Sequence, residues 1–199
     1  MKDKLINNSL NKIRLKYPEF TNTKLEEIKY GIESLYLTIT KMIILIILSI
    51  IFNIKKEFII FLLLYNGIRI FAFGLHAKKS SWCLISSIIF FIVLPIILKF
   101  IIINKFVISI LGSILLINYY KYSPADTRKR PIVNVKIRLK YKYLSCIIAI
   151  IYLFIALIIN NIYISNLLFS AVLLEGLLIN PYIYKLFGFT YDNYKNYHV

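Results

Sequence analysis

The stretch CLISSIIFFIVLPIIL, residues 83–98, contains no charged side chain. Similar apolar runs recur along the chain, so that 59% of its 199 residues are hydrophobic and the mean hydropathy is +0.73. A soluble domain is roughly 45–50% apolar, and a chain this short cannot bury so many runs in a soluble core. A helix crosses a bilayer with about 20 mostly apolar residues. The sequence therefore predicts an all-α, polytopic transmembrane helical bundle. The other runs are residues 43–54, 58–65, 106–117, 147–159 and 167–179.

Six membrane-embedded segments are expected after a leader of residues 1–34. Several of them are short or carry a charge, such as Lys41 in the first and Arg69 in the second. A rival interpretation has four full spans and two segments that are only partly inserted. Residues 35–186 would form the membrane domain and residues 187–199 a tail. The predicted segments are 35–54, 57–75, 83–103, 105–120, 143–162 and 164–186.

The leader combines an amphipathic pattern with basic charge. Between Lys2 and Lys16 the apolar residues share one helical stripe, as in a helix that lies in a membrane interface. Pro18 should end that helix, and Thr21 or Thr23 is suited to cap a second short helix. The first 30 residues contain no apolar stretch of the kind that a cleavable signal peptide needs, so we expect the first span to direct insertion.

Basic residues determine the expected orientation. Most of the 25 lysines and arginines lie in the leader and in the loop 121–142, whereas residues 163–165 contain none. With six spans, both termini, the turn 76–82 and the loop 121–142 are then cytoplasmic. The net charge of +16 would face anionic membrane lipids rather than nucleic acid, for which the sequence has no binding motif.

The polar segment between the second and third spans holds a candidate catalytic pair. The stretch RIFAFGLHAKKSSWC, residues 69–83, contains His76, the interior histidine, and Cys83, one of two cysteines. A thiol nucleophile needs a nearby base. On one unbroken helix these residues would lie about 10.5 Å apart along the axis, too far for a hydrogen bond of about 2.6–3.2 Å. A dyad therefore requires a helix end between them.

Such a break is expected from Gly74 and the polar run 78–81. Ser80 or Ser81 is suited to cap the next helix. Cys83 would then lie in its first turn, where the positive end of the helix dipole favours a thiolate. The alternative is that the histidine is an interfacial polar residue and that the cysteine only packs.

The same stretch resembles the accessory gene regulator B (AgrB) family of membrane peptidases. Its core is His76-Ala77, five residues and then Cys83, preceded by an arginine and a glycine. Two further matches keep the order of the family: KYGIE at residues 29–33 and KYSPADTRKRPI at residues 121–132. The chain length, the basic character and the layout of spans agree as well, so the resemblance covers nearly the whole chain.

The resemblance implies a cysteine endopeptidase of the bacterial cell membrane that matures a peptide pheromone. Such enzymes process an AgrD-like precursor with an amphipathic leader, a central pheromone segment and an acidic tail. His76 matches the catalytic histidine of the family and Cys83 its nucleophile. An acyl-thioester on Cys83 would form as the tail leaves, and a thiol or hydroxyl of the peptide would then close a thiolactone or lactone. No cofactor or metal is implied, and a homodimer fits the family.

Other residues are expected to contact the precursor or to support the site. Lys129 and Arg130 would attract the acidic tail, although orientation alone explains most charges of their loop. Arg69 lies inside a span and is by default functional or paired. Glu175, in the last segment, is expected to pair with a basic group that the sequence leaves open. The remaining candidates for precursor binding are Glu33, Lys78, Lys79 and Ser80.

A second class of function is a non-enzymatic transporter or channel subunit, in which Arg69, Lys99 and Glu175 would line a pathway. The small size of the chain and the lack of a visible internal repeat count against it. A transporter should tolerate Cys83→Ala, and a peptidase should not.

Overall fold

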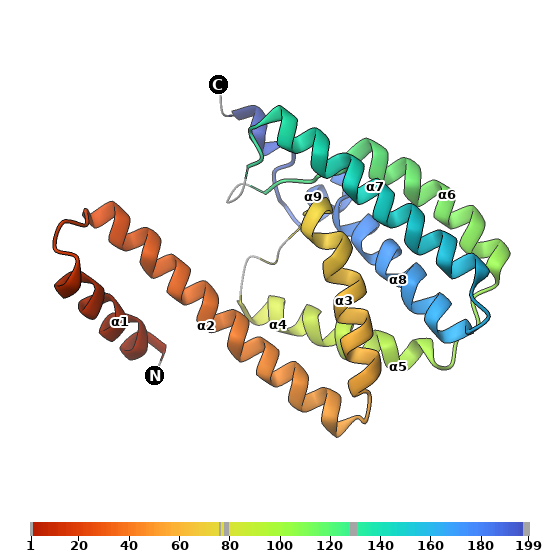
Figure 1. The fold of residues 1–199 in the computed structure, drawn as a ribbon, viewed down its shortest axis with the longest axis horizontal. Coiled ribbons are helices and arrows are strands. Elements are labelled where there is room, and N and C mark those ends of the chain that lie inside the picture. Colours follow the sequence, from red (N-terminus) through yellow and green to blue (C-terminus); the bar gives the residue numbers. More distant parts are fainter. Residues whose placement is uncertain (1, 76, 78–79, 128–130, 197–199) are drawn as a thin grey trace. The chain divides into compact units, whose positions relative to one another are not determined.

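The computed structural model describes residues 2–75, 77, 80–127 and 131–196 (Figure 1). These residues form helices joined by loops, and an isolated β-bridge connects Phe73 and Ala125. The predicted all-α fold is confirmed. The helices are α1 (Lys2–Lys16), α2 (Asn22–Ile51), α3 (Lys55–Ala72), α4 (Ser80–Ile88), the π-helical η1 (Ile89–Val93), α5 (Leu94–Leu98), α6 (Lys105–Tyr122), α7 (Val135–Ile158), α8 (Ile162–Leu178), α9 (Pro181–Leu186) and the 3-10 turn η2 (Asn193–Asn196).

The chain divides into two compact units, Met1–Phe52 and Asn53–Val199. In the first unit, α1 packs against α2 and buries Ile6. As predicted, α1 ends just before Pro18. Thr21 caps α2, because its Oγ1 accepts a hydrogen bond from the Lys24 N–H at 3.3 Å.

The prediction of a second short helix in the leader is wrong. Helix α2 runs for 30 residues, from the leader through most of the predicted first span 35–54. The one glycine in its first half, Gly31, is tolerated within a helix, and the neighbouring Glu, Lys, Leu and Ile residues favour continuation.

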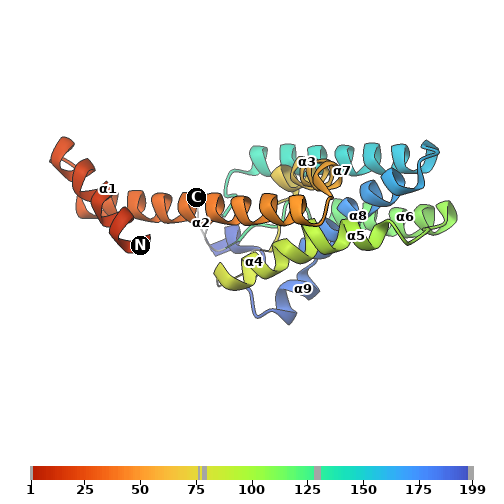
Figure 2. The ribbon, with the colours of Figure 1, turned by 90° about the horizontal axis from the view of Figure 1, so that it is seen from below.

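In the second unit, α8 is the central helix. It packs against α3, α5, α6 and α7, and its residues 165–172 are all buried. Figures 1 and 2 show α7 running alongside both α6 and α8. Glycines permit the close approach, because a Cβ on Gly112 of α6 would lie 3.0 Å from Leu153 of α7 and one on Gly176 of α8 would lie 2.8 Å from Leu115 of α6.

Three helices are long and apolar enough to cross a membrane: α2, the continuous helix Ser80–Leu98 and α7. Helix α8 is apolar but shorter. Large apolar side chains such as Ile147, Ile150 and Phe154 of α7 are exposed on the surface of the chain, as lipid-facing residues would be. Each of the six predicted segments contains a helix, and three meet the length and composition of a full span.

The third segment contains a wide turn. Helix Ser80–Leu98 passes through η1 immediately before Pro95. Proline has no N–H, and in a regular helix its ring collides with the carbonyl four residues earlier. The π-helical turn accommodates this residue without ending the helix.

Two predicted boundaries are wrong. The segment 164–186 is not one helix, because α8 ends at Leu178 and Asn180 caps the separate α9, with Pro181 in its first turn. The polar loop 121–142 is shorter than expected and comprises residues 123–134, because Asn134 caps α7 through hydrogen bonds from Lys136 N–H and Ile137 N–H to its Oδ1. The lysines and arginines of residues 136–142 therefore lie on α7.

Candidate functional site

The helix end that the dyad hypothesis requires is present. Helix α3 ends at Ala72 and α4 begins at Ser80, and Leu75 and Ala77 between them are not helical. Cys83 is the fourth residue of α4. Its partner in the predicted dyad, His76, lies outside the described residues, and so do Lys78 and Lys79.

Cys83 lies in the first turn of a helix that continues to Leu98. The thiol-bearing residue is partly buried. Its carbonyl oxygen accepts hydrogen bonds from Ser86 Oγ at 3.1 Å and Ser87 Oγ at 2.8 Å. The N–H groups of a first helical turn lack intrahelical acceptors, and the dipole of the helix stabilises negative charge there. Ser80 and Ser81 are themselves helical, so neither stands in the expected cap position.

Arg69, in the last turn of α3, holds the chain that leads to position 76. Its Nη1 lies 2.9 Å from Glu175 Oε2 on α8. Its Nη2 donates to the carbonyl oxygens of Gly74 at 3.2 Å and Leu75 at 2.6 Å. The guanidinium of Arg69 thus connects the last turns of α3 and α8 to the carbonyls of Gly74 and Leu75, the two residues before His76.

Gly74 is required at its position for two reasons. Its φ of +97° is rarely adopted by residues with a side chain. A Cβ there would lie 2.8 Å from Arg69 Nη1 and 3.0 Å from the Leu178 carbonyl oxygen. The glycine therefore lets the chain pass directly over the guanidinium.

Backbone hydrogen bonds hold the same segment from two further sides. Gly74 N–H donates to the Ala125 carbonyl at 2.8 Å, and Ala125 N–H donates to the Ala72 carbonyl at 2.9 Å. Leu75 N–H donates to the Leu178 carbonyl at 3.0 Å. The sequence motifs at residues 69–83 and 121–132, far apart along the chain, therefore meet in space.

Asp126 is a functional candidate that no sequence motif singles out. Its carboxylate is fully buried and accepts hydrogen bonds from the N–H groups of Asn193 at 3.0 Å and Tyr194 at 2.9 Å. It also accepts a longer bond of 3.4 Å from the Ile132 N–H and lies 3.7 Å from Arg138 Nη1. The available signal was composition, because Asp126 is the one acidic residue in the basic stretch 121–142.

Two tyrosines fasten the C-terminal segment to the same loop. The Tyr184 hydroxyl donates to the Ala125 carbonyl at 3.1 Å, and the Tyr191 hydroxyl donates to the Tyr122 carbonyl at 2.8 Å. Burial raises the pKa of Tyr191, so this hydroxyl remains a donor at neutral pH. The chain before position 76 is thus supported by α8, by the loop and, through the loop, by the C-terminal segment.

The remaining predicted residues are dispersed. Glu33 lies in α2, in the first unit, and Lys129 and Arg130 lie outside the described residues. Lys99 Nζ lies 2.6 Å from Glu57 Oε1 and forms an ion pair with it. Glu57 is in the first turn of α3, at the opposite end of that helix from Arg69. Within the described part of the chain, no group of three His, Cys, Asp or Glu residues is placed to hold a metal ion.

Comparisons with known proteins identify the family of the chain. The family described as accessory gene regulator B (AgrB) matches residues 4–179. An AgrB-like protein of Clostridium acetobutylicum is 32% identical over 181 residues, which are 90% of this chain and 86% of that protein. An AgrB-like protein of Listeria innocua is 29% identical over 171 residues, 86% of this chain and 84% of that protein.

Accessory gene regulator protein B of Staphylococcus aureus is 31% identical over 159 residues, 80% of this chain and 84% of that protein. No solved structure matches the chain. The family match spans the apolar helices, the segment around Cys83 and the loop that contains Asp126. The chain is a membrane protein that belongs to the accessory gene regulator B family, which takes part in agr quorum sensing.

Proposed function

We propose that this chain is a membrane cysteine endopeptidase that cleaves an AgrD-like pheromone precursor at the junction with its C-terminal tail. The observation that carries the proposal is the helix break between Ala72 and Ser80. It places Cys83 in the first turn of a long apolar helix, and Arg69 anchors the chain immediately before His76. A straight helix would have kept the two predicted catalytic residues apart.

The first half of the proposed reaction cuts the precursor. His76 accepts the proton from Cys83 Sγ, and the thiolate attacks the carbonyl carbon of the scissile peptide bond. The C–N bond then breaks, and His76 returns the proton to the nitrogen of the departing tail. The pheromone segment remains attached to Cys83 as an acyl-thioester.

The second half closes the ring. A thiol or hydroxyl side chain of the pheromone segment attacks the thioester carbonyl, and the bond to Cys83 Sγ breaks. The proton of the attacking group goes to the cysteine, which restores the free thiol. No water is consumed in this path. Transfer between two thiols is nearly isoenergetic, so hydrolysis is the competing loss, and a site at the start of a membrane-embedded helix limits it by restricting water.

The transport alternative loses its main support. It depended on Arg69, Lys99 and Glu175 as charges that line a pathway. Arg69 and Glu175 form an ion pair with each other, and Lys99 pairs with Glu57. Paired charges at opposite ends of α3 have a structural explanation and need no transported ion.

Co-expression with a precursor peptide, followed by mass analysis of the products, tests the proposal. Wild type and Cys146→Ala should release the tail and the cyclic product, because Cys146 lies in the middle of α7. Cys83→Ala and His76→Ala should release neither, while retaining normal amounts of protein in the membrane. Cleavage by Cys83→Ala would show that the nucleophile is elsewhere and would end the proposal.

A further inference from the structure

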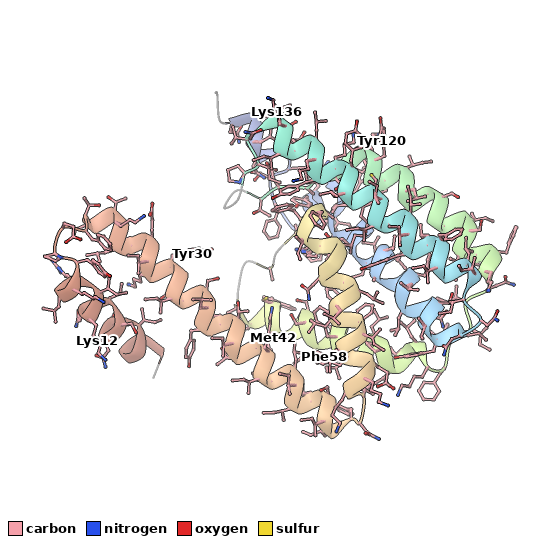
Figure 3. All side chains as sticks on the ribbon, in the orientation of Figure 1. Lys12, Tyr30, Met42, Phe58, Tyr120 and Lys136 are labelled. Atoms are coloured by element: carbon pink, nitrogen blue, oxygen red, sulfur yellow. The ribbon has the colours of Figure 1, made fainter. Side chains whose placement is uncertain are left out.

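A cavity of about 380 Å³ opens where the end of α6, the start of α7 and the C-terminal segment meet. Figure 3 marks this end of the two helices, with Tyr120 on α6 and Lys136 on α7. Its lining combines basic, aromatic and apolar side chains. The residues on which the argument depends are Lys121, Lys142, Arg138, Val135, Leu139 and Tyr194.

The positive charge of this cavity is only partly neutralised within the protein. Arg138 faces two carboxylates, Asp126 at 3.7 Å and Asp192 at 3.5 Å, and its guanidinium stacks on a tyrosine ring. Lys121 and Lys142 have no ion pair within the described part of the chain. The two lysines therefore leave a net positive charge at the cavity, which favours an anionic ligand.

Both lysines lie over aromatic rings. Lys142 Nζ lies 4.1 Å from the centroid of the Tyr120 ring, and Lys121 Nζ lies 5.2 Å from that of Tyr122. These cation–π contacts restrict the two ammonium groups to the rim of the cavity. Less side-chain entropy is then lost when a ligand binds.

The apolar part of the lining indicates which anion fits. Val135 and Leu139 of α7 are exposed beside the lysines, and the exposed surface of α7 stays apolar further along at Ile147. The cavity thus lies where the surface of a membrane helix changes from apolar to basic. Phosphate groups of lipids lie at this depth, and basic pockets between membrane helices bind lipid headgroups. An acidic peptide segment offers carboxylates but no acyl chain for Val135 and Leu139.

We infer that this cavity binds the phosphate of an anionic phospholipid, with Lys121 and Lys142 on the phosphate and with Val135 and Leu139 against the beginning of the acyl chains. The site is separate from the proposed nucleophile and does not depend on the peptidase activity. Bound lipid would fix the ends of α6 and α7, between which the loop with Ala125 and Asp126 emerges.

Native mass spectrometry of the full chain in detergent tests the inference, with phosphatidylglycerol and phosphatidylcholine added in parallel titrations. The variant Lys121→Gln/Lys142→Gln removes the two rim charges. The matched control Lys136→Gln/Lys140→Gln removes two exposed charges from α7 that do not line the cavity. A lysine near an anionic lipid contributes on the order of a few-fold in affinity, so the cavity variant should lose roughly tenfold or more for phosphatidylglycerol. The control should lose little.

Equal losses in the two double variants would overturn the site, because they would show a general effect of charge. Equal retention of phosphatidylglycerol and phosphatidylcholine by the wild type would overturn it too. Displacement of the lipid by inorganic phosphate, or by a glutamate-rich peptide at equal concentration, would assign the cavity to a soluble anion instead. Lys142→Arg preserves the charge and should retain the lipid, and circular dichroism confirms that each variant is folded.

Discussion

Glu175 of α8 is fully buried and lies 2.9 Å from Nη1 of Arg69, the residue whose Nη2 binds the carbonyls of Gly74 and Leu75. The ion pair therefore couples the packing of two helices to the path of the chain before position 76. Buried ion pairs contribute little net stability, but removal of one partner leaves the other charge uncompensated. We interpret this pair as a positioning device for the proposed site.

Glu175→Ala should strongly destabilise the protein. It leaves the guanidinium of Arg69 without its charge partner, and breaking a buried pair in this way costs about 3–5 kcal/mol. Thermal unfolding in detergent measures the change. Glu57→Ala is the control, because its pair with Lys99 is partly exposed and such pairs contribute about 0–1 kcal/mol. Similar shifts for the two variants would contradict the distinction between a buried and an exposed pair.

Arg69→Lys separates positioning from stability. Lysine keeps the charge opposite Glu175 but lacks the planar fork that also reaches Gly74 and Leu75. We expect near-normal folding and a rate of tail release that is lower by about tenfold or more, a change of about 1.4 kcal/mol in the activation free energy. Precursor cleavage followed by mass measures it, and Lys99→Arg should cleave like the wild type. An unchanged rate in Arg69→Lys would show that the fork is not needed.

Gly74→Ala should abolish or strongly reduce cleavage. The added Cβ meets Arg69 Nη1 at 2.8 Å and the Leu178 carbonyl at 3.0 Å, and the positive φ disfavours alanine independently. Gly31→Ala makes the matched comparison, because nothing lies within 4 Å of a Cβ there and alanine favours the helix by about 0.5–1 kcal/mol. Paired cleavage assays and thermal unfolding would distinguish them. Equal activity of the two variants would refute the role of Gly74.

The sequence predicts the helix ends that depend on nearby residues. Gly74 and the polar run 78–81 indicated the break before Cys83, and Pro18 and Thr21 marked the end of α1 and the start of α2. The continuity of α2 is not predicted by polarity, because the leader is polar and the span is apolar although helix propensity does not change between them.

Contacts between segments far apart in the chain are harder to predict from the sequence. Glu175 was expected to have a basic partner, but Arg69 is 106 residues away and nothing in a local pattern names it. The sequence does not single out Asp126, because its hydrogen-bond donors are the backbone N–H groups of Asn193 and Tyr194. A backbone N–H group does not depend on the side chain and so leaves no pattern in the sequence. A single carboxylate among basic residues is the signal that such a group leaves in the sequence.

Asp126→Asn should release the C-terminal segment from the loop. The two carboxylate oxygens accept hydrogen bonds from the N–H groups of Asn193 and Tyr194. In asparagine one of these oxygens becomes an NH₂ group, which is a donor and faces one of the two N–H groups without an acceptor. An unsatisfied buried group costs about 1–3 kcal/mol, so hydrogen exchange at Asn193 and Tyr194 should accelerate roughly tenfold or more. Ala125 directly precedes Asp126, and its carbonyl accepts a hydrogen bond from the Gly74 N–H, so precursor cleavage should fall as well.

Asp192→Asn is the comparison for that experiment. Asp192 is partly exposed, pairs with Lys195 at 2.6 Å and has a φ of 54°, which asparagine tolerates. Its hydrogen bond raises the pKa of Lys195, but a surface pair of this kind contributes little to stability. Exchange at residues 193 and 194 should therefore stay near the wild-type rate. If both variants accelerate exchange equally, the segment is held by the surface pair, and Asp126 does not couple it to the chain before position 76.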